Sequence, residues 1–308
     1  MIAILRKELA DYFTSIRLVI LFILVFFVSA AGVFGANQGI RGANLPEGFI
    51  FLGLFTTSGN VIPSLVGLIA LLVPIIGIAL GFDAINSERS GGTLSRILSQ
   101  PVFRDSVING KFLAGIVTLS IMVATMLLLV SGYGLRMIGV PPTAEEIIRL
   151  FIYLFLTIIY GAFWMGLAVL FSVLFRRIAT SLLTSIGVWL FFSIFIFLIV
   201  PAIANAIAPI ADGSQAEMIR NAELNRVIMR VSPNNLFSEA ATALLLPMAV
   251  GSLGIITTSQ VAYMLPNPLG LGQSLILIWP HLTSLVSLSV ICFAISYVLF
   301  MRQEIRAT

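Results

Sequence analysis

Residues 18–36 read LVILFILVFFVSAAGVFGA and contain no charged side chain. A helix rises about 1.5 Å per residue, so this run matches the roughly 30 Å hydrocarbon core of a lipid bilayer. Five further uncharged apolar runs follow along the chain, at residues 61–82, 112–135, 150–175, 181–208 and 275–301. The sequence therefore predicts an all-α, polytopic membrane protein with six transmembrane helices, forming a single transmembrane domain over residues 1–308.

The composition excludes several classes of protein. Of the 308 residues, 59% are hydrophobic and only 10% are charged, whereas soluble domains carry about 25% charged residues. A water-soluble enzyme, a disordered chain and a secreted disulfide scaffold are therefore excluded. The single cysteine, Cys292, and the single histidine, His281, exclude an intrachain disulfide and a multi-histidine metal site. We expect no bound metal, and no basic cluster supports binding of nucleic acid.

Basic residues predict how the chain crosses the membrane. With a cytoplasmic N-terminus, eleven Lys and Arg residues fall on the cytoplasmic side and six outside. Three of the six outside lie in one long segment, and long segments contribute little to the orientation of the chain. Both termini of this multi-pass cell-membrane protein are therefore expected in the cytoplasm. The apolar stretch 236–262 leaves the number of spans open. Glu239 and Pro247 favour a re-entrant or surface helix pair there, and a seventh span would place the C-terminus outside.

Residues 1–17 have the pattern of an amphipathic helix. Apolar side chains recur at helical spacing, at Ile2, Leu5, Leu9, Tyr12, Phe13 and Ile16. The opposite side carries Arg6, Lys7, Glu8 and Asp11. We expect this helix to lie in the membrane interface, either as a plain anchor or as a surface that also contacts a cytoplasmic partner.

The segment 83–111, between the second and third apolar runs, is the longest cytoplasmic loop. Within it Gly92 interrupts the chain, Thr93 can cap a helix, and Pro101 ends that helix after about two turns. The short helix has an apolar stripe formed by Leu94, Ile97 and Leu98. So short a helix is marginal by itself, and its apolar side must find a protein surface. A solvated loop held by the lipid surface is the alternative.

A wider pattern around this helix resembles the cytoplasmic loop of type-two ABC transporter permeases. It comprises Asp83, Glu88, Arg89, Gly92, Thr93, Leu94, Leu98, Ser99, Pro101, Arg104, Gly110 and Lys111. The N-terminal amphipathic helix, the six spans and the large helical segment outside the membrane before the last span are also similar to that family. Residues Ser232, Pro233, Leu236 and Phe237 further resemble its nitrous-oxide-reductase-maturation branch.

The resemblance implies that ATP hydrolysis and passage across the membrane are carried out by different subunits. In that family the loop carries a coupling helix that docks on a separate ATPase, which implies this role here for Glu88, Arg89, Gly92, Thr93, Leu94, Ile97, Leu98 and Arg104. It also implies that the ATPase subunit binds ATP and Mg²⁺, and that the chain pairs with a second permease copy or a homologue among the membrane lipids. The resemblance does not identify a substrate.

The external segment 209–274 is longer than a connector needs. Ser214 and Glu217 form a capping-box pattern that opens a helix ending at Arg230, and residues 236–246 predict a second helix. Gating of the outer mouth, binding of a partner and simple capping of the span ends are open alternatives for this segment.

Small residues predict close helix packing. Gly77 and Gly81 form a GxxxG pattern in the second apolar run, and Ala162 and Gly166 repeat the spacing in the fourth. Such a stripe serves either packing within the chain or a contact between two copies.

Two absences in the sequence bear on the source of energy. Ion-coupled carriers usually keep ionisable groups within the membrane, but the six runs hold only His281, which we expect to be a hydrated group at the interface. The GxxxxGK[ST] phosphate-binding loop is also missing, because Phe112 follows Gly110 and Lys111. Both absences fit a membrane subunit driven by a separate ATPase. Together with the resemblance, they lead us to expect a permease subunit of an ABC-type exporter, without catalytic or cofactor-binding residues of its own. A non-transporting scaffold or force-transmitting subunit, a secondary carrier and an intramembrane enzyme are the alternatives.

Overall fold

The computed structural model describes residues 1–42, 50–59, 62–92, 103–210, 214–246 and 269–303. Across these ranges every regular element is a helix. Six helical segments are long and apolar enough to cross a membrane: Ile16–Ile40, Leu65–Ser90, Arg104–Met137, Ala144–Leu174, Ile178–Ile207 and Leu271–Arg302. The prediction of an all-α protein with six spans is confirmed.

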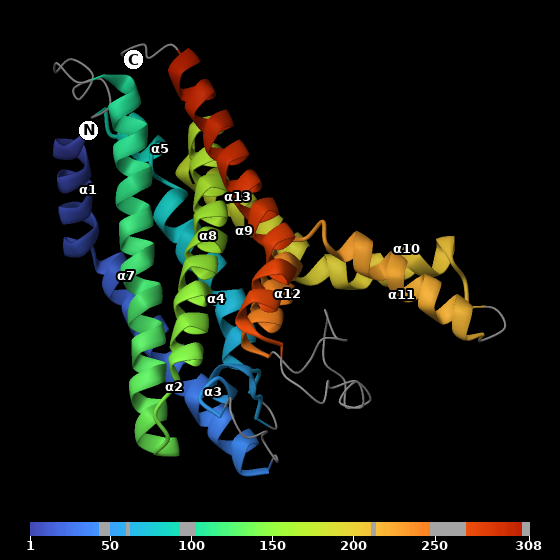
Figure 1. Ribbon diagram of the computed structural model, residues 1–308. Helices are drawn as coiled ribbons and strands as arrows, with labels where there is room; N and C mark the ends of the chain where they lie inside the picture. The colour runs from blue at the N-terminus through green and yellow to red at the C-terminus, as the bar shows by residue number, and fades with distance from the viewer. Residues whose placement is uncertain (43–49, 60–61, 93–102, 211–213, 247–268, 304–308) are drawn as a thin grey trace. The chain divides into compact units, whose positions relative to one another are not determined.

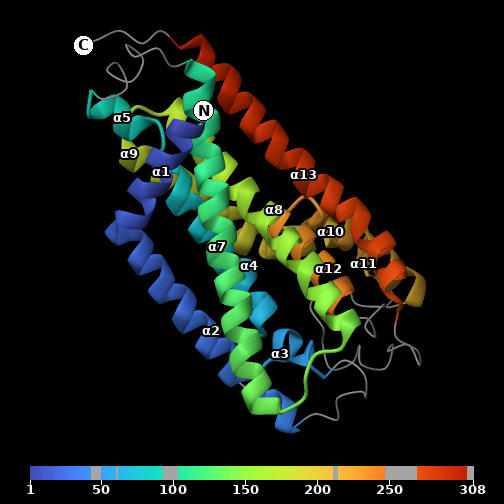
Figure 2. The same cartoon turned by 60° about the vertical axis from the view of Figure 1, so that its left-hand side comes forward.

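The chain forms two compact units, one of Met1–Ile186 with Val286–Thr308 and one of Gly187–Leu285. The first unit contains α1 (Ile2–Thr14), α2 (Ile16–Gly42), α3 (Gly53–Thr56), α4 (Leu65–Gly81), α5 (Asn86–Ser90), α7 (Arg104–Ile138), α8 (Ala144–Leu174), most of α9 (Ile178–Leu190) and the C-terminal half of α13 (Leu271–Arg302). The span that begins with α4 is the most enclosed of the six, and α4 packs mainly on α8 (Figure 1). Both α1 and α2 pack along α7 (Figure 2). A helix that is apolar on all sides, as α4 is, suits this enclosed position.

Glycines let α4 and α8 approach each other closely. A Cβ atom added to Gly77 would lie 2.7 Å from the backbone oxygen of Gly161, and one added to Gly81 would lie 2.6 Å from that of Met165. Neither distance leaves room for a side chain. The GxxxG spacing in α4 therefore serves a helix contact within one chain.

The second pair of small residues makes a different contact. A Cβ atom added to Gly166 would meet Phe112 and Cys292 at 3.7 Å, which is an ordinary contact distance. Ala162 is buried. The closest contacts of α4 are instead with Gly161 and Met165, which directly precede Ala162 and Gly166 in α8.

Pro74 lies inside α4 and has no N–H group to donate to the carbonyl of Ala70 one turn earlier. The hydroxyl of Tyr160 on α8 donates to that carbonyl instead, at 3.0 Å. A carbonyl without a donor is costly in the interior of a membrane, where no water is available. The contact between α4 and α8 therefore also completes the hydrogen bonding of α4.

Glu146 connects the start of α8 to α3. It forms a capping box with Thr143, which fixes the first turn of α8. Its Oε1 atom accepts hydrogen bonds from the backbone N–H groups of Phe51 and Leu52, at 3.0 and 3.2 Å. Glu146 is only 2% exposed, and both of its carboxylate oxygens accept hydrogen bonds.

The second unit contains the end of α9, a π-helical turn (Phe191–Phe195), α10 (Ile196–Ile207), α11 (Gln215–Met229), α12 (Pro233–Leu245) and the start of α13. The start of α11 is as predicted, because the hydroxyl of Ser214 accepts a hydrogen bond from the N–H of Glu217. α12 begins one turn earlier than predicted, since Ser232 caps it and Pro233 occupies its first turn. Residues 247–262 of the ambiguous apolar stretch lie outside the described residues.

Candidate functional site

The predicted coupling loop is described at its two flanks. α5 ends at Ser90, and Gly92 follows with a φ of +69°, in the left-handed region that favours glycine. The residues of the predicted coupling helix, among them Thr93, Leu94, Ile97 and Leu98, lie outside the described residues. The candidate site is therefore the set of contacts made by the flanks. We call it the loop base, and it consists of Lys7, Glu8, Glu88, Arg89, Arg104, Lys111 and Gln303.

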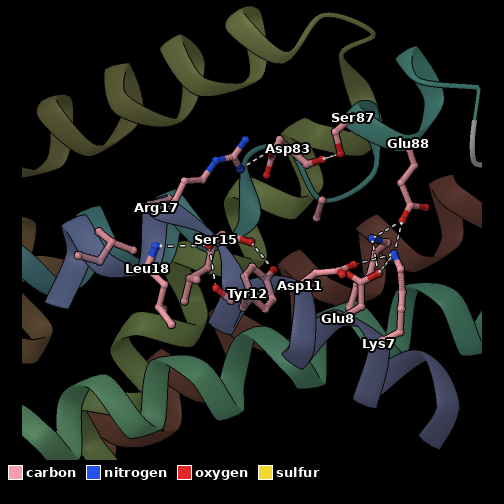
Figure 3. Close-up of a pocket in the computed structure, with 15 residues that line it drawn as sticks. Lys7, Glu8, Asp11, Tyr12, Ser15, Arg17, Leu18, Asp83, Ser87 and Glu88 are labelled. Atoms are coloured by element: carbon pink, nitrogen blue, oxygen red, sulfur yellow. Dashed lines mark hydrogen bonds and ion pairs between the residues drawn. The ribbon is translucent and has the colours of Figure 1, made fainter.

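Lys111 joins three helices at the loop base. Its ammonium group lies 2.9 Å from Oε1 of Glu8 on α1 and 2.7 Å from Oε1 of Glu88 on α5, and the three side chains are only 7–10% exposed. Lys7 reaches the same two carboxylate oxygens from the exposed side, at 2.9 and 3.5 Å, and also pairs with Asp11 (Figure 3). Ion pairs therefore tie α1, α5 and α7 together at one end of the bundle.

These charges stabilise the junction only as a set. Removing one partner of a buried ion pair costs about 3–5 kcal/mol, because it leaves an uncompensated charge. Burial alone would lower the pKa of Lys7, but its bonds to Glu8 and Asp11 outweigh burial and raise that pKa above its ordinary value. Lys7 therefore stays charged while the loop base is formed.

Glu8, on the charged side of the predicted amphipathic helix, is buried in the structure. Glu8 is 8% exposed because it faces Lys111 on α7. α1 comes this close because Gly110 has no side chain, and a Cβ atom there would lie 2.8 Å from Cγ2 of Ile4. Two apolar side chains of α1, Ile2 and Phe13, are exposed instead, and so is Ile16 at the start of α2.

Gln303, just beyond α13, bridges the two flanks of the loop. Its side-chain oxygen accepts a hydrogen bond from Arg89, and its backbone oxygen accepts one from Nη1 of Arg104 at 3.2 Å. Its amide nitrogen donates to the backbone oxygen of Val173 at the end of α8. Arg89 and Arg104 are thus brought together by a residue that sequence reasoning missed. The signal for Gln303 is slight, a single glutamine after the last apolar run.

Two serines hold the turn that leads into α5. The hydroxyl of Ser172 accepts hydrogen bonds from the N–H groups of Ile85 and Asn86, at 2.9 and 3.1 Å, and that of Ser181 donates to the carbonyl of Phe82 at 2.7 Å. Ile85 also belongs to an apolar cluster with Val107, Ile108, Val173 and Phe300. The loop base is therefore anchored by packing as well as by charge.

A cavity of about 370 Å³ lies beside the loop base, between α1, the start of α2 and the turn after α4 (Figure 3). Arg17 and Asp83 both line it and form an ion pair, and the guanidinium of Arg17 lies 5.4 Å from the ring centre of Phe82. The hydroxyl of Tyr12 donates to the carbonyl of Leu80 at 2.9 Å. Burial raises the pKa of the Tyr12 phenol, so the cavity keeps a neutral hydroxyl among its charges.

A second polar cluster lies in the other unit, around Glu239 on α12. One carboxylate oxygen accepts from Nε of Arg230 at 2.9 Å and lies 2.7 Å from Nε2 of His281, and the other accepts from Nδ2 of Asn235 at 2.9 Å. His281 is 6% exposed, so the expectation of a hydrated interfacial group is wrong. Its second ring nitrogen faces the carbonyl of Leu277 at 3.2 Å. Both ring nitrogens therefore face hydrogen-bond acceptors.

Comparison with known proteins assigns the chain to a family. Residues 2–305 match the model of the ABC-2 family transporter protein. The chain is 29% identical over 205 residues to the probable ABC transporter permease protein NosY of Pseudomonas aeruginosa, an alignment covering 61% of this chain and 65% of the relative. It is 36% identical over 109 residues to the protein of the same name from Stutzerimonas stutzeri, covering 35% of this chain and 36% of that one.

Both alignments span less than two thirds of the relative's own length. The family model, by contrast, extends over almost the whole chain and includes every described residue of the loop base. The resemblance drawn from the loop pattern is confirmed, and the chain belongs to the ABC-2 family of transporter proteins.

Proposed function

We propose that the chain is the membrane-spanning permease subunit of an ABC-type exporter in the cell membrane, driven by a separate ATPase subunit. The family, the six spans and the names of the two relatives support this role. The sequence has no phosphate-binding loop, so the proposal assigns ATP and Mg²⁺ to the ATPase. A second copy of the chain, or a homologue, completes the path across the membrane.

The observation that carries the proposal is the loop base. Glu88 precedes the segment 93–102 and Lys111 follows it, and both are tied to α1 through the Lys7 and Glu8 ion pairs. Gln303 ties the same two flanks to the end of α13. A displacement of residues 93–102 would therefore be transmitted to the ends of several helices at once, because the loop base connects them.

In the proposed cycle the ATPase docks on the apolar stripe of the loop, formed by Leu94, Ile97 and Leu98. Closure of the ATPases on ATP displaces this stripe, and the loop base carries the displacement into the spans. Packed helices change between discrete arrangements and do not deform continuously, so a small shift at the loop can switch the whole bundle.

The test places a charge in the proposed contact. Leu98→Asp puts an unpaired carboxylate into an apolar surface, which costs on the order of 2–5 kcal/mol when the contact forms. We expect this variant to insert normally but to lose copurification with a coexpressed ATPase, or to lose transport while the ATPase keeps its basal rate. Ser99→Asp is the matched control, because the pattern places Ser99 on the polar side of the same helix.

Two results would contradict the proposal. Normal ATPase binding and normal transport by Leu98→Asp would remove this segment from the coupling contact. Hydrolysis of ATP by the purified chain alone, above that of a mock preparation, would show that the chain does not depend on a separate ATPase.

A further inference from the structure

The cavity beside the loop base is lined mainly by polar and apolar groups that take no part in the proposed contact with the ATPase. Its volume of about 370 Å³ is in the range of small-ligand sites. Charged and hydroxyl groups from α1 and from the turn after α4 converge on it (Figure 3). The remaining walls are apolar and consist of Leu18, Leu21, Ala79, Leu80 and Ala84. A polar part beside an apolar part matches an amphiphilic ligand.

The cavity lies at the boundary between polar and apolar surface. Arg17 is the last charged residue before the uncharged run of α2, and Asp83 is the first after that of α4. On α1 and α2, Phe13, Ile16 and Ile20 are 49%, 72% and 56% exposed. Exposed apolar side chains beside a span are suited to lipid. The cavity is therefore at the depth of the lipid headgroups.

The charges on the walls select the class of headgroup. Glu8, Glu88 and Lys111 are engaged with one another in the loop base. The other charged groups of the lining are two cations and two anions: Lys7, Arg17, Asp11 and Asp83. They also form pairs within the chain, Lys7 with Asp11 and with the loop base, and Arg17 with Asp83. A purely anionic headgroup would meet the two carboxylates, and a purely cationic one would meet the two cations. A zwitterion can face both kinds of charge.

We propose that this cavity binds the headgroup of a phospholipid that carries both a phosphate and a primary amine. The guanidinium of Arg17 offers a planar fork that suits phosphate, and its side chain is 57% exposed, so a ligand can reach it although it pairs with Asp83. A primary ammonium has three hydrogen atoms to donate to Asp11, Asp83 and the cavity hydroxyls, whereas a trimethylated ammonium has none. The apolar walls take the glycerol backbone and the first methylene groups.

The same headgroup chemistry also exists in a water-soluble compound, glycerophosphoethanolamine. The two sources differ in their acyl chains, which the walls formed by Leu18 and Leu21 would contact. The experiment therefore compares four ligands on the purified full chain by native mass spectrometry: dioleoyl phosphatidylethanolamine, phosphatidylcholine, phosphatidylglycerol and glycerophosphoethanolamine. We expect one phosphatidylethanolamine to be retained per chain, with each of the other three retained about tenfold less.

Variants connect the binding to the cavity. Arg17→Ala and Asp11→Asn should each reduce retention of phosphatidylethanolamine by about tenfold, as expected for loss of a charge-assisted contact. Both side chains are more than half exposed, so neither change disturbs the packed core. Arg6→Ala is the matched control, because Arg6 is exposed on α1, the helix that also carries Asp11, and does not line the cavity.

Three outcomes would overturn the proposal. Retention of phosphatidylcholine or phosphatidylglycerol as strong as that of phosphatidylethanolamine would remove the role of the amine. Equal retention of glycerophosphoethanolamine would make the ligand a soluble phosphate compound. Retention by both Arg17→Ala and Asp11→Asn equal to that of Arg6→Ala would place the bound lipid elsewhere on the protein.

Discussion

Glu239 is a buried carboxylate whose charge is set by its neighbours. Burial alone would raise the pKa of this group, but hydrogen bonds from His281 and Arg230 outweigh burial and hold the pKa below its ordinary value of 4.5. The folded protein therefore binds fewer protons at this site than the unfolded chain does near that pH. The stability that Glu239 contributes is complete above pH 4.5 and is lost as the pH falls through its folded-state pKa.

We predict that Glu239→Gln lowers the free energy of unfolding at neutral pH by about 1–3 kcal/mol, the usual cost of leaving buried donors without a charged acceptor. The variant should also lose part of the decline in stability that the wild type shows in acid. Thermal unfolding of the full chain in detergent, repeated at several pH values, measures both effects. Glu223→Gln on the exposed side of α11 is the control, and a Glu239→Gln profile that coincides with it would show that the cluster contributes nothing.

At the scale of elements, α1 meets α7 at a glycine. A Cβ atom on Gly110 would lie 2.8 Å from Cγ2 and 3.1 Å from Cβ of Ile4, with the backbone nitrogen of Leu5 at 3.5 Å. We predict that Gly110→Ala displaces α1 and strains the ion pair between Glu8 and Lys111. Overpacking of this kind typically costs about 1–3 kcal/mol, which should appear as a lower unfolding temperature.

The same helix provides the control for this prediction. A Cβ atom on Gly132 of α7 would meet nothing within 4 Å, so Gly132→Ala should be neutral or should stabilise the helix by up to about 1 kcal/mol. The double variant Gly110→Ala with Ile4→Ala removes the obstructing Cγ2 atom and should recover part of the loss. Equal unfolding temperatures for Gly110→Ala and Gly132→Ala would show that the close approach of α1 is unimportant.

The helices also show what a single sequence can and cannot predict. The spans were predictable because an uncharged run of about 20 residues needs no knowledge of its neighbours, and the start of α11 because the cap at Ser214 is local. Glu8 and Gln303 were not predictable as site residues. Their partners Lys111 and Arg89 lie more than a hundred residues away along the chain. A helical pattern shows which side chains share a face, but not which face meets a charge.

For the predicted coupling residues, too, the sequence pattern indicated the positions but not their contacts within the chain. Glu88, Arg89 and Arg104 were identified by the family pattern, and the structure shows each of them bonded within the chain at the loop base. Their contact with an ATPase stays a prediction. Gly92 was predicted to interrupt the chain, and its left-handed backbone conformation gives that interruption a physical reason.

At the scale of the whole molecule, the distribution of basic residues predicts the topology. In a background lacking Cys292, a membrane-impermeant maleimide should label Thr180→Cys only from the cytoplasmic side and Gln215→Cys only from outside. Both positions are exposed, Thr180 in the first turn of the span that begins at Ile178 and Gln215 at the start of α11. Labelling of Thr308→Cys from outside would contradict a cytoplasmic C-terminus and favour a seventh span within residues 236–262.

The proline in α4 has a consequence for the time course of biosynthesis. The carbonyl of Ala70 receives its hydrogen bond from Tyr160, ninety residues later in the chain. At about 5–20 residues per second, a ribosome takes roughly 5–20 seconds to make that stretch. During this interval the second span already exists, but the donor that the carbonyl of Ala70 requires has not been made. The second span is therefore completed only when the fourth arrives, so the order in which the spans are made differs from the order in which they are finished.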